Sequence, residues 1–124
     1  MEKLGNYFNS ELNEYIGTKL PKIMTSIDLD LLQVKASRKI VRLAEYKHDK
    51  ESVGDQQDKA LKRLGKFASV INNNPNLFEG WQLQILLIRG NKPYDNISVY
   101  CYVTDKIYYL NDKKKIDKFL TLER

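Results

Sequence analysis

One amphipathic segment, placed between two groups of apolar segments, most constrains the fold of this chain. In residues 55–73, apolar side chains recur at intervals of three and four residues, which predicts a helix with a single apolar stripe. Its members are Ala60, Leu61, Leu64, Phe67, Ala68 and Ile71. Residues 82–88 are strongly apolar and predict a central strand. A helix that leads into a buried strand can serve as a crossover, so a parallel pair within a mixed sheet is expected.

Shorter segments supply the rest of the expected fold. Two of them predict helices and four predict strands, because their apolar residues recur at helical spacing or lie between turn-forming clusters. These are the helices at residues 7–20 and 113–122 and the strands at residues 23–35, 39–48, 97–103 and 107–110. The first two strands are expected to form a hairpin. We therefore predict one α/β domain over residues 1–124, with a mixed central β-sheet flanked by helices.

Acidic residues interrupt the apolar strands of the first predicted hairpin. Asp28 and Asp30 lie in the first strand and Glu45 lies in the second. Lys47 follows on the same face as Glu45, and Asp30 is expected to lie near Glu45 across the hairpin. A buried carboxylate needs a partner, and hard divalent cations take carboxylate oxygens. This grouping predicts metal-assisted hydrolysis of a phosphodiester bond. The two aspartates are also compatible with charges that protect an edge strand from aggregation.

The order of these elements, with Asp30 followed by Glu45-Tyr46-Lys47, resembles the PD-(D/E)XK nuclease superfamily, and small phage-type members in particular. This superfamily includes restriction-endonuclease-like enzymes and Holliday junction resolvases. The resemblance extends over residues 11–102 and implies a restriction-endonuclease-like αβββαβ core. It implies that Asp30 and Glu45 hold Mg²⁺ or Mn²⁺, that the main-chain carbonyl of Tyr46 completes the coordination, and that Lys47 positions or activates the attacking water.

Further contributors to the site stay open at the level of the sequence. Asp28 is a rival for the role of the first acid, because a regular strand would place it on the same face as the other aspartate. The resemblance implies that an acid from the first helix, Glu11 or Glu14, could join the metal ligands. It also implies that a glutamine at the start of the long helix, Gln56 or Gln57, could contact the site.

The chain carries a formal net charge of +5, which favours a polyanionic partner. Four basic residues lie largely off the apolar stripe of the long helix: Lys59, Lys62, Arg63 and Lys66. We predict that they bind nucleic acid, and DNA in particular, although such a face is often only solvated. No apolar run is long enough to span a bilayer, and the single cysteine, Cys101, has no disulfide partner. An intracellular, cytoplasmic protein is expected, with a phage origin as one option.

Two functions other than a simple nuclease stay open. The first is a non-catalytic module that binds nucleic acid or inhibits a partner protein on a nuclease-like fold. The second is a resolvase selective for junctions or branched DNA, which would require a homodimer because two strands are cut symmetrically. The presence of Asp30, Glu45 and Lys47 together favours a metal-dependent endonuclease.

Overall fold

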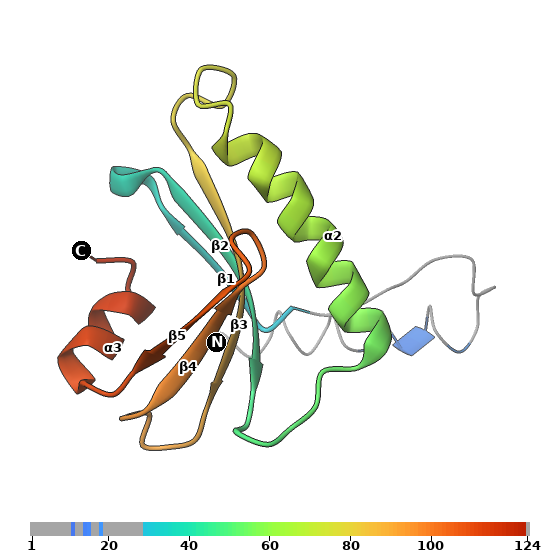
Figure 1. The fold of residues 1–124 in the computed structure, drawn as a ribbon, viewed down its shortest axis with the longest axis vertical. Coiled ribbons are helices and arrows are strands. Elements are labelled where there is room, and N and C mark those ends of the chain that lie inside the picture. Colours follow the sequence, from blue (N-terminus) through green and yellow to red (C-terminus); the bar gives the residue numbers. More distant parts are fainter. Residues whose placement is uncertain (1–10, 12–13, 16–17, 19–28, 124) are drawn as a thin grey trace.

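The computed structural model describes Glu11, Glu14, Tyr15, Thr18 and residues 29–123 (Figure 1). The fold is α/β, as predicted: a five-stranded mixed sheet lies between helix α2 (Asp55–Asn72) and helix α3 (Lys113–Leu120), one on each face (Figure 1). The strands are β1 (Leu31–Lys35), β2 (Ile40–Lys47), β3 (Gln82–Gly90), β4 (Ile97–Cys101) and β5 (Lys106–Leu110). Within this part of the chain, no helix is both long enough and apolar enough to cross a membrane.

The third strand is central in the sheet, as predicted. The strands follow the order β1-β2-β3-β4-β5. β2 and β3 pair in parallel from Ile40 opposite Gln82 to Lys47 opposite Arg89, whereas the other neighbouring pairs are antiparallel. α2 provides the crossover that a parallel connection requires. The carboxyl ends of β2 and β3 therefore lie at the same edge of the sheet.

Two apolar clusters fill the space between the sheet and its helices. β3 contributes to both, because successive side chains of a strand point to opposite faces. Ile85 and Leu87 pack on the α2 side, whereas Leu86 and Ile88 pack on the α3 side. Their buried neighbours are Leu61, Ala68 and Tyr102 on the α2 side, and Ala44, Ile97, Val99 and Ile116 on the α3 side. Burial on both faces explains why the sequence of β3 is an unbroken apolar run.

The first strand is shorter than predicted. β1 begins at Leu31, so Asp30 precedes the strand instead of lying inside it. The Asp30 carboxylate accepts a hydrogen bond from the main-chain N–H of Tyr46, at 2.9 Å, and so takes the place of a ladder partner at this end of the hairpin. Residues 23–28, with Asp28 among them, lie outside the described residues. Of the three strands that an αβββαβ core places before its second helix, the described residues include two.

The predicted first helix falls largely outside the described residues, but its described members agree with it. Glu11, Glu14, Tyr15 and Thr18 all have helical backbone conformation. The Thr18 hydroxyl donates to the Glu14 carbonyl at 2.8 Å, which is a one-turn contact typical of a helix.

The apolar stripe predicted for α2 is wrong at one position. Phe67 is 57% exposed, whereas Leu61 and Ala68 are fully buried. The buried stripe includes Gly65 instead, and this glycine lies against the main chain of Tyr102. The sheet covers only part of the apolar side of the helix, so Phe67, at the border of the predicted stripe, lies in solvent. Helical spacing alone does not show how much of the helix a sheet covers.

The first hairpin holds the end of the last helix. The Arg42 guanidinium, on β2, donates to the Phe119 carbonyl at 2.6 Å and stacks on the Phe119 ring at 4.1 Å. Three neighbouring side chains donate to the next carbonyls along the chain: Gln33 to Leu120, Lys35 to Thr121 and Arg38 to Leu122. The last carbonyls of a helix have no intrahelical partners and carry partial negative charge, so cationic donors satisfy and stabilise this end.

Replacing Gly65 by alanine should destabilise the protein, although alanine is the better helix former. A methyl group at this position would lie 2.5 Å from the Tyr102 carbonyl oxygen, so α2 would have to move away from the sheet. We expect Gly65→Ala to lower the free energy of unfolding by about 2 kcal/mol, measured by urea denaturation. The matched control is Gly54→Ala, whose methyl group would meet nothing within 4 Å and should cost less than about 1 kcal/mol. Equal effects of the two changes would contradict the close packing of α2.

Candidate functional site

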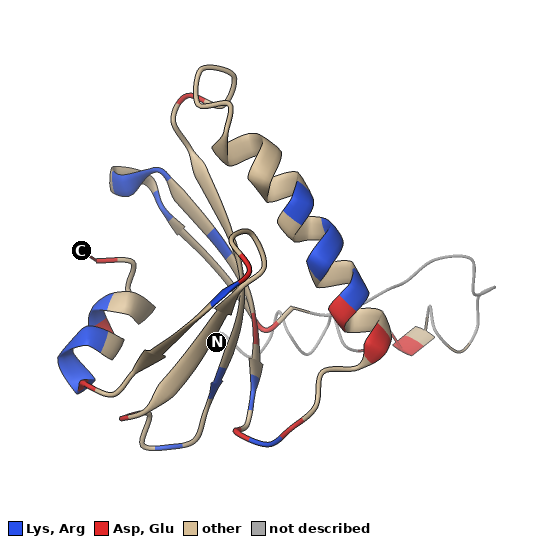
Figure 2. Ribbon diagram, viewed as in Figure 1, with Lys and Arg blue, Asp and Glu red and all other residues tan. Residues whose placement is uncertain are grey.

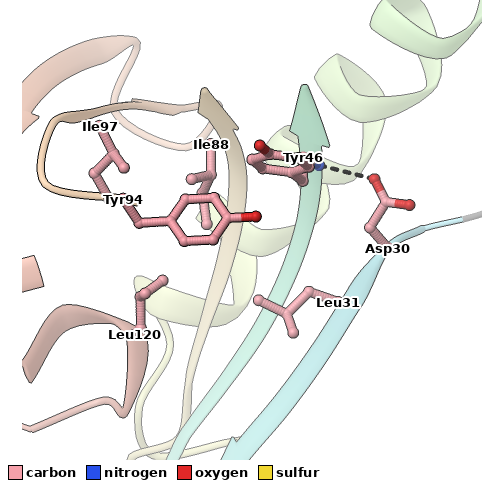
Figure 3. A pocket seen from close by; sticks show the side chains of 7 residues that line it. All are labelled: Asp30, Leu31, Tyr46, Ile88, Tyr94, Ile97 and Leu120. Carbon is pink, nitrogen blue, oxygen red and sulfur yellow. Dashed lines mark hydrogen bonds between the residues drawn. The ribbon is translucent and has the colours of Figure 1, made fainter. Parts of the chain in front are cut away.

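The structure brings Asp30 and Glu45 together at one end of the first hairpin. Leu31 pairs with Ala44 in the β1–β2 ladder, so the preceding residue, Asp30, lies beside Glu45. The two carboxyl groups are hydrogen-bonded to each other. Asp30 also accepts a hydrogen bond from the Tyr46 main-chain N–H, as Figure 3 shows. Two acids that are fifteen residues apart in the sequence therefore share one hydrogen-bonded group.

Glu45 is a carboxyl group buried under α2. Its side chain points to the α2 side of the sheet, where the Gln57 side-chain amide donates a hydrogen bond to it. The residue is only 4% exposed. Burial raises the pKa of Glu45 to about 8, and the hydrogen bond and negative charge of Asp30 act in the same direction, whereas the positive charge of Lys47 opposes them. Near neutral pH, Glu45 therefore retains a proton that a bound cation would displace.

Lys47 belongs to the same site. It follows Glu45 by two residues on β2, so both side chains lie on the α2 side of the sheet. The lysine side chain is 18% exposed, and its ammonium group lies 3.8 Å from the Glu51 carboxylate. Lys47 is close enough to Glu45 for its charge to favour the ionised glutamate. The site thus places one partly shielded cation beside the two acids.

Two neighbours of this site show how far sequence reasoning could go. Gln57, one of the two glutamines at the start of α2, donates a hydrogen bond to Glu45. Glu51, the partner of Lys47, was missed, because it lies in a polar connection with no periodic pattern. The spacing of four residues between Lys47 and Glu51 could have indicated this ion pair, but such spacing brings side chains together mainly in helices.

The donor set of this site consists of two carboxylates. In the part of the chain that the structure describes, no three His, Cys, Asp or Glu side chains gather as a metal cluster. Asp28 lies outside that part, and Glu11 is exposed on helical backbone. Paired carboxylate oxygens still fit Mg²⁺ or Mn²⁺, which often bind through one or two carboxylates and complete their coordination with water. Burial is the main cause of the raised pKa of Glu45, and Asp30 adds to it; the positive charge of a bound cation would offset both.

The basic residues of α2 lie on its solvent-exposed side. Lys59, Lys62, Arg63 and Lys66 are all exposed and recur at intervals along the helix (Figure 2). Lys59 is paired with Asp55 at 3.2 Å, and Lys62 is paired with Asp58 at 2.9 Å. Arg63 and Lys66 have no ion-pair partner among the described residues. They are therefore the members of this group whose charge is least neutralised.

No family model, curated protein or solved structure matches this chain. The site is therefore defined by its own geometry. Three elements build this geometry: the start of β1, the end of β2 and the first turn of α2.

Replacing Glu45 by glutamine should change how stability depends on pH. Folding raises the pKa of Glu45 from 4.5 to about 8, so between these values the folded state binds more protons than the unfolded state. The free energy of unfolding of the wild type should therefore fall as pH rises through this window, by about 5 kcal/mol. Glu45→Gln cannot lose a proton and should lack this fall, which urea denaturation at several pH values would measure.

The matched control for this prediction is Glu79→Gln, at an exposed glutamate in the turn before β3. It should keep the pH dependence of the wild type. If wild type and Glu45→Gln show parallel stability curves across this pH range, Glu45 does not retain a proton in the folded chain.

Proposed function

We propose that this protein is a metal-dependent nuclease that hydrolyses phosphodiester bonds in DNA. The observation that carries the proposal is the contact between the carboxyl groups of Asp30 and Glu45, with Lys47 on the same strand beside them. Two carboxylates can hold a cation, and a lysine adjacent to them can act on the water or on the phosphate. The net charge of +5 supports a polyanionic substrate.

Each residue of the site has a distinct task in this proposal. Asp30 and Glu45 would hold Mg²⁺ or Mn²⁺, with the main-chain carbonyl of Tyr46 as a third donor. When bound, such a cation lowers the pKa of water and neutralises charge on the phosphate. Lys47 orients the attacking water and stabilises negative charge that develops on the phosphate. Gln57 is a positioning residue, because its amide fixes the orientation of the Glu45 carboxylate.

Loading of the site is linked to pH. Glu45 must lose its proton to act as a ligand, and burial holds its pKa at about 8. Metal binding therefore releases a proton and strengthens as pH rises. Lys47 must also turn from Glu51 to the substrate in order to act. The two groups are 3.8 Å apart and the glutamate is half-exposed, so their ion pair is weak enough to break when the substrate binds.

A non-catalytic nucleic-acid-binding module is the second candidate, and one observation favours it. Glu45 already has hydrogen-bond partners in Gln57 and Asp30, and Lys47 has an ionic partner in Glu51. A network that is satisfied in this way can be stable without a cation. Such a module would bind nucleic acid through α2 and would need neither metal nor turnover.

Cleavage assays separate the two candidates. Wild-type protein with Mn²⁺ should cut at least one of duplex, single-stranded or branched DNA, and Ca²⁺ should support binding with little turnover. Binding of Mn²⁺ should also raise the melting temperature of the wild type. Asp30→Ala and Glu45→Ala should abolish both this rise and cleavage. Lys47→Ala should keep that rise but lower the cleavage rate by about 100-fold or more.

The matched control for these variants is Lys50→Ala, at an exposed lysine close in sequence to the site. It should retain cleavage. Absence of cutting on all DNA substrates and on RNA would exclude the enzyme and leave the binding module. Equal cutting by the wild type and by a variant that combines Asp30→Ala, Glu45→Ala and Lys47→Ala would do the same.

The exposed basic face of α2 makes a separate prediction about affinity. Arg63→Glu and Lys66→Glu should each weaken DNA binding and reduce the slope of log affinity against log salt by about 0.7–0.9 for each phosphate that the variant no longer binds. Lys118→Glu, an exposed lysine on the opposite helix α3, is the matched control and should leave the slope unchanged. Fluorescence anisotropy at several salt concentrations measures both. A slope that is insensitive to Arg63 and Lys66 would place the DNA-binding surface elsewhere.

A further inference from the structure

A cavity of about 290 Å³ lies on the face of the sheet opposite the Glu45 side chain (Figure 3). It opens where β2 and β3 end, between the start of β1, the turn before β4 and the end of α3. Seven residues line it: Asp30, Leu31, Tyr46, Ile88, Tyr94, Ile97 and Leu120. Asp30 is the lining residue whose side chain also takes part in the proposed metal site, so the two sites meet at its carboxylate.

The walls of this cavity are mostly apolar and partly aromatic. Leu31, Ile88, Ile97 and Leu120 supply its aliphatic surface. Tyr46 and Tyr94 supply two rings, whose centroids are 6.1 Å apart and whose planes are 75° apart. The Tyr46 hydroxyl donates to the Gly90 carbonyl at 2.6 Å, and burial together with Tyr94 raises the pKa of Tyr46 to about 12. Asp30 is the one acidic residue among the described residues that line the cavity.

The chemistry of this lining selects the kind of group that can enter. None of the seven lining residues is Lys or Arg, and Asp30 would repel an anion, so a phosphate is disfavoured. A flat, largely apolar group with N–H donors is favoured, because it can pack on tyrosine rings and donate to the aspartate. The volume is at the lower end of the range for ligand pockets, which suits one ring system better than a longer chain. Nucleobases have this combination of a flat ring and an amino edge.

The position of the cavity connects this chemistry to the substrate. Asp30 is hydrogen-bonded to Glu45 and is also one of the residues that line the cavity. A phosphodiester that binds a cation held by the two acids would have a neighbouring nucleotide close to the cavity. A base in an intact duplex is stacked and paired, so only an unpaired or extruded base can enter. We propose that this cavity accepts one unpaired nucleobase next to the scissile phosphate, which makes the protein selective for nucleic acid with unpaired nucleotides.

This inference rests on the proposed function, but it is tested by binding and not by cleavage. A short single-stranded DNA is prepared as a series in which one base at a time is replaced by an abasic site. Affinity is measured with Ca²⁺ in place of Mg²⁺. For the wild type, removal of the base at one particular position should weaken binding about tenfold, because stacking of one base on aromatic side chains is worth about 1–3 kcal/mol.

Tyr94→Ala should weaken binding of the intact strand by a similar factor and remove the penalty of the abasic site. Tyr109→Ala is the matched control, since it deletes the same ring from a 75% exposed position on β5, and it should keep the penalty. Leu120→Phe, which fills the cavity from α3, is a second variant and should also remove the penalty. A fluorescent base analogue, 2-aminopurine, at the sensitive position should change its emission on binding to the wild type and not on binding to Leu120→Phe.

The outcomes separate this inference from the nuclease proposal. An abasic penalty that Tyr94→Ala removes, in a protein that does not cut with Mn²⁺, supports the base site and excludes the enzyme. Cleavage that requires Glu45, together with affinity that is equal for every abasic strand, supports the enzyme and overturns the base site. The base site is also overturned if the loss of affinity for the abasic strand persists in both Tyr94→Ala and Leu120→Phe. It is overturned as well if the cavity binds small apolar dyes but strands with and without the base bind equally.

Discussion

The parallel pairing of β2 with β3 is the constraint on which the rest of this structure depends. It joins segments that α2 separates in the sequence, and it places the four buried residues Ile85 to Ile88 in the middle of both apolar clusters. Since parallel strands finish at one edge, their carboxyl ends, the first turn of α2 and the turn before β4 all meet there. Both the acidic site and the apolar cavity lie at this edge, one on each side of the sheet.

The cost of burying Glu45 explains the composition of its surroundings. A carboxyl group at 4% exposure is tolerated because it keeps a proton, receives the Gln57 amide and shares a hydrogen bond with Asp30. A purely structural role would be served as well by an apolar residue, since buried polar groups seldom add net stability. Acids whose pKa is shifted by burial and by a second acid are more frequent at functional sites than elsewhere in proteins.

The sequence predicted the elements whose signal is local. The period of α2, the apolar run of β3 and the pairing of Asp30 with Glu45 follow from spacing and from the register of one hairpin. The features that it did not predict depend on distant neighbours. Phe67 is exposed because the sheet covers only part of the helix, and Gly65 is buried because Tyr102 crosses it. The cavity is lined by residues from five separate segments of the chain, and the periodicity of no single segment predicts a cavity between them.

The hydrogen bonds between the first hairpin and the end of α3 have a consequence for the dynamics of the fold. α3 spans only eight residues, which is too short to be stable alone in water. Its last two carbonyls accept from Arg42 and Gln33, and the next two carbonyls of the chain accept from Lys35 and Arg38. The helix therefore cannot detach without exposing the buried Arg42. Two segments more than seventy residues apart in the sequence should therefore open as one cooperative unit. Their amide protons would then exchange with solvent at a common rate, although one segment is a hairpin and the other a helix.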